Sequence, residues 1–231
     1  MNKSLGLWES AYSLGGHNTL WPWSDLVSLV SRHICPISSP EKFNMLELGC
    51  GPGSNIPFFL SLKVNYHAID GSATAIDKVH TAFPVLSQKV VTGDFTRENV
   101  FSSRHDFFDL IVDRSAITHS NRNEIKSILK YILHSLKPGG VFIGVDWFSK
   151  NHDDSLLGVE HSDKDTRTNI LTGECSGIGK VHFSDQENMR NLFSSFDIIL
   201  LEEKVVTKYE SSSQRKIAYW NIVAKKIQGK I

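Results

Sequence analysis

The sequence predicts an α/β protein built on a mostly parallel β-sheet with helices on both faces. Three observations support this fold class. Between residues 44 and 147, short apolar runs alternate with longer amphipathic segments, as is typical of βαβ units. A glycine-dense turn follows the first apolar run. Near the C-terminus, two runs rich in branched and aromatic residues are separated by a short polar segment, which predicts an antiparallel hairpin.

The composition is that of an ordinary globular protein. Of 231 residues, 40% are hydrophobic and 22% charged, and 25 basic side chains balance 25 acidic ones. Without a basic surplus, we expect neither nucleic acid nor an anionic membrane as a partner. Three cysteines without a CxxC pair indicate neither a disulfide framework nor a zinc site. No apolar stretch resembles a signal peptide or a membrane span, so we expect a cytoplasmic protein.

Five strands are expected in the central part of the chain, at residues 44–48, 64–69, 88–92, 108–112 and 141–145. The clearest helix between them covers residues 122–136, where apolar residues recur every three or four positions. The segment Lys137-Pro138-Gly139-Gly140 should end it, because proline cannot continue a helix and glycine supplies the turn.

The flanking segments complete a single domain, 1–231. Residues 1–43 carry an aromatic cluster, which predicts either a lid over a ligand or a helix on the flank of the sheet; its members are Trp8, Tyr12, His17, Trp21 and Trp23. Residues 44–147 form the cofactor-binding core, and 148–183 a polar insert in which 151–180 is expected to be a long loop or lid. Residues 184–231 should supply a helix, beginning at the capping box Ser184-Asp185-Gln186-Glu187, and the hairpin of strands 197–209 and 215–225.

The glycine-dense turn has the spacing G-x-G-x-G, at Gly49, Gly51 and Gly53. Such a turn either brings a ligand against bare backbone or only allows close packing of strand and helix. The spacing differs from the G-x-G-x-x-G of dinucleotide-binding folds. Pro52 removes a backbone donor, and Glu47 would repel a pyrophosphate but suits a ligand with an ammonium and a sulfonium group.

Three further carboxylates are expected at the same edge of the sheet. Asp70 ends the second strand, 21 residues after Gly49, where an acidic residue accepts hydrogen bonds from ribose hydroxyls. Asp94 follows the third strand and Asp113 ends the fourth. Each alone could be a solvated loop residue or a helix cap. Four carboxylates at successive strand ends, with Glu47, indicate a binding site.

These segments resemble the motifs of class I S-adenosylmethionine-dependent methyltransferases. The first motif is closely resembled by Glu47-Leu48-Gly49-Cys50-Gly51-Pro52-Gly53. Four further segments resemble the later motifs and follow one another in the same order as in the family: Ile69-Asp70-Gly71-Ser72, Gly93-Asp94-Phe95, 107–113 and 136–140. The resemblance implies a seven-stranded sheet that includes the C-terminal antiparallel hairpin, and S-adenosylmethionine as the cofactor.

The resemblance also implies a role for each matching residue. Gly49, Gly51 and Gly53 would line the cofactor, with Glu47 near its amino group. Asp70, followed by Gly71 in the same motif, would hold the ribose. Asp94 would bind the adenine amino group, with Phe95 beside the ring, and Asp113 the methionine end.

We expect methyl transfer to an oxygen or nitrogen atom of a small molecule. The sulfonium is an activated donor, so the protein mainly aligns the acceptor, and a general base is needed only for a protonated acceptor. His119 and Asp146 are candidates, although His119 could equally be a hydrogen-bonded structural residue. Arg114-Ser115-Ala116 departs from the Asn/Asp-Pro-Pro-aromatic signature of enzymes that methylate amino groups of DNA bases or glutamine.

Two other functions fit parts of the pattern. A non-catalytic S-adenosylmethionine-binding module would keep the same loop without turnover. A nicotinamide-dependent oxidoreductase would use a similar sheet, but the glycine spacing and Glu47 disfavour it. The sequence carries no signal for an oligomeric state.

Overall fold

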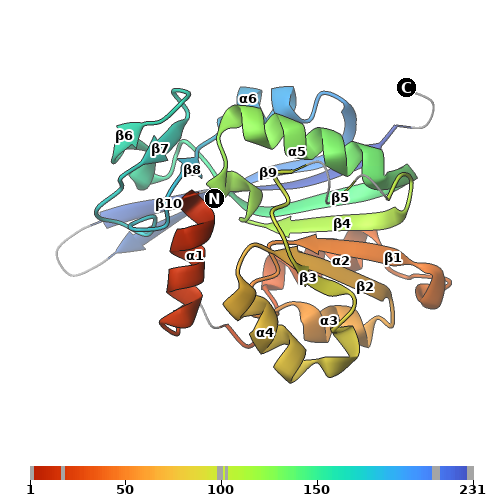
Figure 1. Ribbon diagram of the computed structural model, residues 1–231. Coiled ribbons are helices and arrows are strands. Elements are labelled where there is room, and N and C mark those ends of the chain that lie inside the picture. The colour runs from red at the N-terminus through yellow and green to blue at the C-terminus, as the bar shows by residue number, and fades with distance from the viewer. Residues whose placement is uncertain (1–2, 17–18, 98–100, 102–103, 210–213, 228–231) are drawn as a thin grey trace.

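A seven-stranded, mostly parallel β-sheet runs through the middle of the protein (Figure 1). The computed structural model describes residues 3–16, 19–97, 101, 104–209 and 214–227. The strand order is β3-β2-β1-β4-β5-β10-β9, with β10 antiparallel to both of its neighbours. This confirms the predicted fold class, including the C-terminal hairpin. The strands are β1 (Asn44–Leu48), β2 (Asn65–Asp70), β3 (Val90–Thr92), β4 (Phe108–Arg114), β5 (Leu136–Phe148), β9 (Phe196–Tyr209) and β10 (Gln214–Lys226).

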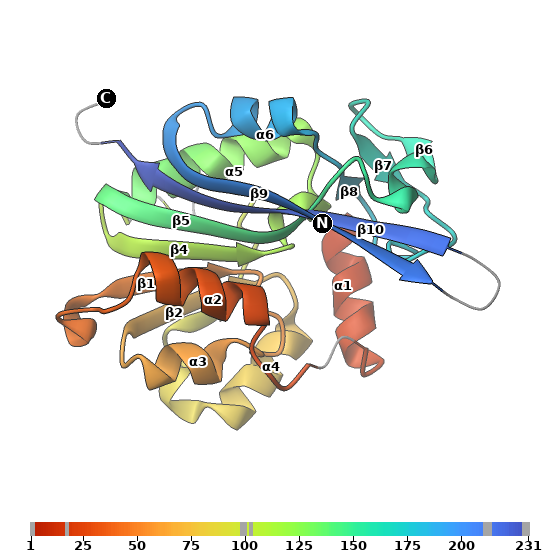
Figure 2. The same cartoon turned by 180° about the vertical axis from the view of Figure 1, so that it is seen from behind.

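Helices cover both faces of this sheet (Figures 1 and 2). The side chains of β4 show why: Leu110 and Val112 join the core on one face and Ile111 the core on the other, so both faces are apolar. Five helices pack their apolar residues against these strands. They are α2 (Ser24–His33), α3 (Ile56–Ser61) and α4 (Ala73–Ala82) on the first face, and α5 (Arg122–Ser135) and α6 (Gln186–Leu192) on the second. Short 3-10 turns connect some elements, namely η1 (Pro40–Lys42), η2 (Pro84–Leu86) and η4 (Ile117–His119).

The caps of α5 and α6 fix where these helices begin. The side chain of Asn121 accepts a hydrogen bond from the Glu124 amide, and the Glu124 carboxylate accepts one from the Asn121 amide, which forms a complete capping box. α5 ends at Ser135, and Leu136 already belongs to β5. At α6 the cap is Asp185 rather than the expected Ser184, because the Asp185 carboxylate accepts from the Asn188 amide.

α1 (Lys3–Ser13) lies at one end of the strands, outside the helix layers that cover the two faces of the sheet (Figure 2). Glu9 anchors it, since this carboxylate accepts hydrogen bonds from the hydroxyl groups of Ser72 and Thr74, each at 2.5 Å. The Lys78 ammonium donates to the carbonyl of Tyr12 at 2.8 Å. The first helix is therefore fastened to the N-terminal half of α4.

The polar insert is not the structureless loop that the sequence predicted. It contains a 3-10 turn, η5 (Asp153–Leu156), and a three-stranded antiparallel sheet of β6 (Val159–Glu160), β7 (Thr166–Thr168) and β8 (Val181–His182). A separate small core supports it, formed by Phe148, Ile170, Cys175, Val181 and Phe183. The prediction failed because strands of two or three residues are too short to show an alternating pattern.

Candidate functional site

A cavity of about 340 Å³ lies at the carboxyl ends of β1, β2 and β4. Parallel strands and their connecting loops commonly bind ligands at this edge. The walls come from α1, the glycine loop after β1, the loops after β2, β3 and β4, the insert and β10. The residues that line it are Leu5, Trp8, Tyr12, Thr19, Trp23, Glu47, Gly49–Pro52, Ser54, Asn55, Asp70, Gly71, Asp94–Thr96, Arg114–Ala116, His119, Ser120, Phe148, Glu174, Ile178 and Tyr219.

The glycine loop presents bare backbone to this cavity. Gly49 and Gly51 have φ values of +66° and +53°, which side chains rarely adopt. A Cβ at Gly49 would lie 2.2 Å from the Cβ of Ala116, and one at Gly51 would lie 2.8 Å from the hydroxyl oxygen of Tyr12. Gly53 has a different role, because a Cβ there would collide with the side chain of Ile56. This glycine allows close packing of the loop against α3. Gly49 and Gly51 are thus the two glycines of this loop that line the cavity and whose surroundings leave no space for a side chain.

Asp70 ties this loop to the end of β2. Its carboxylate accepts hydrogen bonds from the amides of Gly51 and Ser72, each at 2.8 Å. Burial raises the pKa of Asp70, although these hydrogen bonds oppose the rise. Asp70 and its neighbour Gly71 both line the cavity. The carboxylate can accept further hydrogen bonds from a ligand, because an ionised carboxyl group has about four acceptor positions.

Glu47 lies on β1 directly below the loop. It accepts hydrogen bonds from the side-chain amide of Asn55 at 2.8 Å and from the hydroxyl of Tyr66 at 2.6 Å. Burial raises the pKa of Glu47 to about 7 in spite of these two donors. A cation bound beside Glu47 would favour its ionised form.

Asp94 and Phe95 line a different side of the cavity, after β3. One oxygen of Asp94 accepts from the amide and the hydroxyl of Thr96, at 3.0 and 2.6 Å. This local turn fixes the carboxylate next to the largely buried ring of Phe95. A polar group and an aromatic face therefore lie together, as a flat heterocyclic ligand would require.

The structure does not bring Asp113 into the cavity. Its side chain is fully buried and accepts hydrogen bonds from the amides of Ala116 and Ile117 and from the indole of Trp147. Burial raises the pKa of Asp113 to about 7, against the effect of these donors. Asp113 therefore shapes the turn that leads to His119, and contact with the methionine end of the cofactor is not supported by this geometry.

Asp146 does not line the cavity either. Its carboxylate accepts a hydrogen bond from Nε of Arg114 at 2.9 Å. The guanidinium of Arg114 also stacks on the ring of Trp23, with its carbon 3.5 Å from the ring centroid. Arg114 itself lines the cavity. Asp146 thus orients Arg114, and the structure gives it no direct access to a reacting group.

His119 lies in the cavity wall between two aromatic rings. Its ring packs edge-on against Trp8 at 5.0 Å and Phe148 at 6.0 Å between centroids. Nδ1 lies 3.0 Å from the carbonyl oxygen of Lys180. A carbonyl oxygen can only accept, so Nδ1 carries the hydrogen of the neutral ring and Nε2 the lone pair. This is the tautomer that a general base acting through Nε2 needs.

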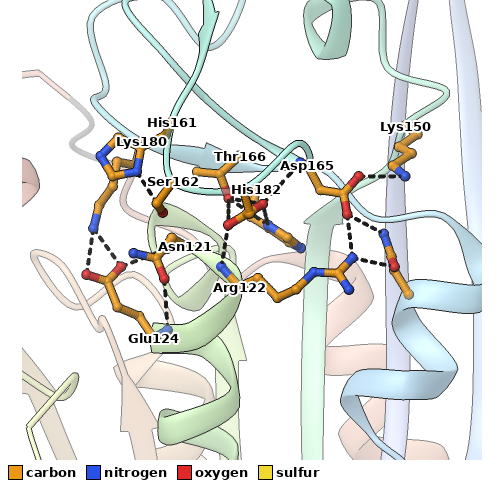
Figure 3. A network of polar contacts seen from close by, with 12 residues as sticks. Asn121, Arg122, Glu124, Lys150, His161, Ser162, Asp165, Thr166, Lys180 and His182 are labelled. Carbon is orange, nitrogen blue, oxygen red and sulfur yellow. Dashed lines mark hydrogen bonds and ion pairs between the residues drawn. The ribbon is translucent and has the colours of Figure 1, made fainter.

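A polar network fastens the insert, which supplies this carbonyl, to α5 and α6 (Figure 3). Arg122 forms an ion pair with the buried carboxylate of Asp165, which also accepts from Asn188 at 2.9 Å. The Lys180 ammonium contacts both oxygens of Glu124, at 2.8 and 2.6 Å. The position of His119 therefore depends on side chains distant from it in the sequence.

Sequence analysis missed several residues of the cavity wall. Trp8, Tyr12 and Trp23 belong to the aromatic cluster for which the sequence predicted either a lid or a helix on the flank of the sheet, whereas Trp21 is exposed and His17 lies outside the described residues. The missed residues include Thr19, Ser54, Asn55, Glu174, Ile178 and Tyr219. None of these stands in a recognisable motif, so no sequence signal could have identified them.

The fold is similar to that of solved S-adenosylmethionine-dependent methyltransferases. Residues 46–142 match the family model described as a methyltransferase domain. The matched segment runs from β1 into β5 and includes the glycine loop, Asp70, Asp94 and Asp113. No curated protein sequence matches the chain significantly.

Solved structures share the fold at low sequence identity. An S-adenosylmethionine-dependent methyltransferase from Anabaena variabilis is 14% identical, with a TM-score of 0.66 over 98% of this chain and 96% of that one. A methyltransferase from Methanosarcina mazei is 19% identical, with a TM-score of 0.63 over 90% and 99% of the two chains. One from Clostridium acetobutylicum is 18% identical, with a TM-score of 0.59 over 98% of each.

In the described part of the chain, no helix has the length and apolarity needed to cross a bilayer.

Proposed function

We propose that the protein transfers the methyl group of S-adenosylmethionine to an oxygen or nitrogen atom of a small molecule. One observation carries the proposal: a single cavity of about 340 Å³ contains both the bare glycine loop with its carboxylates and the ring of His119. α1 and the insert form walls of this cavity, so the reacting atoms would lie in an enclosed site. An enclosed site of this size suits a small acceptor.

The residues of the cavity fit the cofactor. The backbone of Gly49 and Gly51 would pass close to it, because neither position leaves space for a side chain. Asp70 would accept from the ribose hydroxyls, and Asp94 with Phe95 would bind the adenine. Glu47 would pair with the ammonium of the methionine end. When bound, the cofactor supplies an activated methyl group on a positively charged sulfur atom.

His119 would remove the acceptor proton. The Lys180 carbonyl holds the hydrogen of the neutral ring on Nδ1, so Nε2 is the nitrogen that can take a proton from a hydroxyl or an ammonium. The rings of Trp8 and Phe148 would exclude water from this step. Asp146 was the other candidate base in the sequence, and its place beside Arg114 supports an orienting role instead.

The charges of the cavity support a small molecule over a nucleic acid. Four carboxylates line the cavity, from Glu47, Asp70, Asp94 and Glu174, against the single guanidinium of Arg114 among the described residues. A polyanionic backbone would be repelled at this opening.

Methyl transfer from isotopically labelled S-adenosylmethionine tests the proposal. The purified protein is incubated with small-molecule, protein and RNA fractions of a cell extract, and label is expected in the small-molecule fraction. His119→Gln should lower kcat by about 10²- to 10⁴-fold while the Kd for S-adenosylhomocysteine stays the same. His161→Gln, at an exposed position of the insert, is the matched control. Label confined to protein or RNA would overturn the proposed acceptor class.

A further inference from the structure

Among the described residues, one carboxylate that lines the cavity lies outside all the methyltransferase motifs. Glu174 belongs to the insert, beyond the segment 46–142 that matches the family model, and it lines the cavity together with Tyr219 of β10. Its side chain is 31% exposed, so part of the carboxylate is accessible to a ligand. Its surroundings show why it is held there.

The backbone around Glu174 is fixed by a buried carboxylate. Asp154, which is fully buried, accepts a hydrogen bond from the amide of Cys175 at 2.8 Å on one oxygen and from Arg215 at 2.8 Å on the other. Gly173 has φ +93°, and a Cβ there would lie 2.4 Å from an Asp154 oxygen. The turn from Gly173 to Cys175 therefore wraps closely around Asp154 and sets the position of Glu174.

His152 completes this arrangement. His152, Asp154 and Cys175 have potential metal-binding atoms within 4.8 Å of one another. However, Nδ1 of His152 already accepts the Asp154 amide at 3.1 Å, and both Asp154 oxygens are hydrogen-bonded. Because Nδ1 accepts, Nε2 carries the hydrogen of the neutral ring, and it lies 3.7 Å from an oxygen of Glu174, beyond hydrogen-bond distance. His152 and Asp154 therefore fix the turn that carries Glu174, and His152 makes no hydrogen bond to the Glu174 carboxylate.

The carboxylate of Glu174 is held in its ionised form. Burial alone would raise its pKa, but contacts with Lys208, Tyr219 and His152 outweigh burial and lower the pKa. The hydroxyl of Tyr219 donates to Oε2 at 3.0 Å, and the ammonium of Lys208 contacts Oε1. An ionised carboxylate accepts about four hydrogen bonds, so it can still bind a donor from the cavity.

Aromatic and apolar side chains surround this charge. Phe148 packs against Tyr219 with 5.6 Å between ring centroids, and His119 packs against Phe148. Ile178 lines the same cavity. Aromatic faces and a carboxylate both attract cations, and partial burial strengthens the attraction. Lys208 pairs with Oε1 of Glu174, and Asp146 pairs with Arg114, the one guanidinium among the described residues that line the cavity. The Oε2 side of Glu174 would still repel an anion and attract a cation.

We propose that Glu174 selects the acceptor, and that the acceptor carries a protonated amine attached to an aromatic or apolar body. This rests on the proposed function and narrows its substrate class. The amine would bind the Oε2 side of Glu174, and the apolar body would lie against Phe148, Ile178 and Tyr219. Glu174 acts in binding, and His119 keeps the role of base.

Calorimetric titration of the complex with S-adenosylhomocysteine tests this without turnover. The probes are phenethylamine and two matched analogues, 2-phenylethanol and 3-phenylpropionate, which replace the ammonium by a neutral hydroxyl and by a carboxylate. The amine should bind at least about tenfold more tightly than either analogue. Glu174→Gln should abolish this preference, whereas Glu174→Asp, which keeps the charge, should retain it. Glu160→Gln, an exposed position of the same insert, is the control for net charge.

Three results would overturn the inference: 3-phenylpropionate binding as tightly as the amine, an unchanged preference in Glu174→Gln, or no amine binding at millimolar concentration. Its failure can be distinguished from failure of the proposed function. Methyl transfer to neutral or anionic small molecules, unaffected by Glu174→Gln, would refute the amine preference alone. Label found only on protein or RNA would refute the proposed function.

Discussion

Asp70→Asn should weaken both cofactor binding and folding, because the substitution keeps the shape of the side chain but removes its charge and one of its two acceptor oxygens. In the structure, two backbone amides, those of Gly51 and Ser72, donate to the two carboxylate oxygens at 2.8 Å. Asparagine has one acceptor oxygen, so one of these amides would face an NH₂ group. Leaving one buried amide without an acceptor costs about 1–3 kcal/mol of stability.

The free energy of cofactor binding that is lost should be larger than the contribution of a single neutral hydrogen bond. Hydrogen bonds to a charged acceptor contribute about 1.5–3 kcal/mol each, so losing the charge facing two ribose hydroxyls should cost about 3 kcal/mol or more. This corresponds to a Kd for S-adenosylhomocysteine raised by at least about 100-fold, measured by titration calorimetry. Asp77→Asn, at an exposed position of α4, is the control with the same change in net charge. A Kd within threefold of the wild-type value would refute the role of Asp70.

Three further predictions follow from the geometry. Gly49→Ala should raise the Kd for S-adenosylhomocysteine by more than about 100-fold, because φ is +66° and the new Cβ would lie 2.2 Å from that of Ala116; a change below fivefold would contradict this. Burial raises the native pKa of Glu47 from 4.5 to about 7, so between these pH values the native state binds more protons than the unfolded chain. As pH rises through this range, the free energy of unfolding of the wild type should therefore fall by roughly 3 kcal/mol relative to that of Glu47→Gln. Urea unfolding at pH 5 and pH 8 measures the difference, and parallel pH profiles of the two proteins would contradict it. Asp165→Ala should lower the free energy of unfolding by roughly 2–3 kcal/mol, since the buried carboxylate neutralises Arg122; an unchanged urea midpoint would refute this.

The sheet was predictable because its signals are local. Parallel strands buried on both faces form continuous apolar runs, and the turn at Gly49 and the apolar periodicity of 122–136 mark where elements change. The carboxylates at the carboxyl ends of β1, β2 and β3 could be placed at one edge for the same reason. Asp113 looked equivalent in the sequence, but its side chain points to the amides of its own turn and to Trp147.

The acceptor side could not be predicted, because it depends on long-range packing. Glu174 reaches the cavity because Asp154 fixes its turn and Tyr219 arrives from β10, 45 residues later in the chain. Neither contact has a periodic pattern or a fixed spacing. Likewise, the role of the Lys180 carbonyl at His119 is invisible in the sequence, since any residue could supply a carbonyl oxygen.

The central claim is that the glycine loop and the carboxylates at the carboxyl ends of β1, β2 and β3 bind S-adenosylmethionine. A crystal structure with S-adenosylhomocysteine tests it most directly. We expect the ribose hydroxyls within hydrogen-bond distance of Asp70 and the adenine beside Asp94 and Phe95. A ligand bound elsewhere, or one whose ribose faces away from Asp70, would contradict the account.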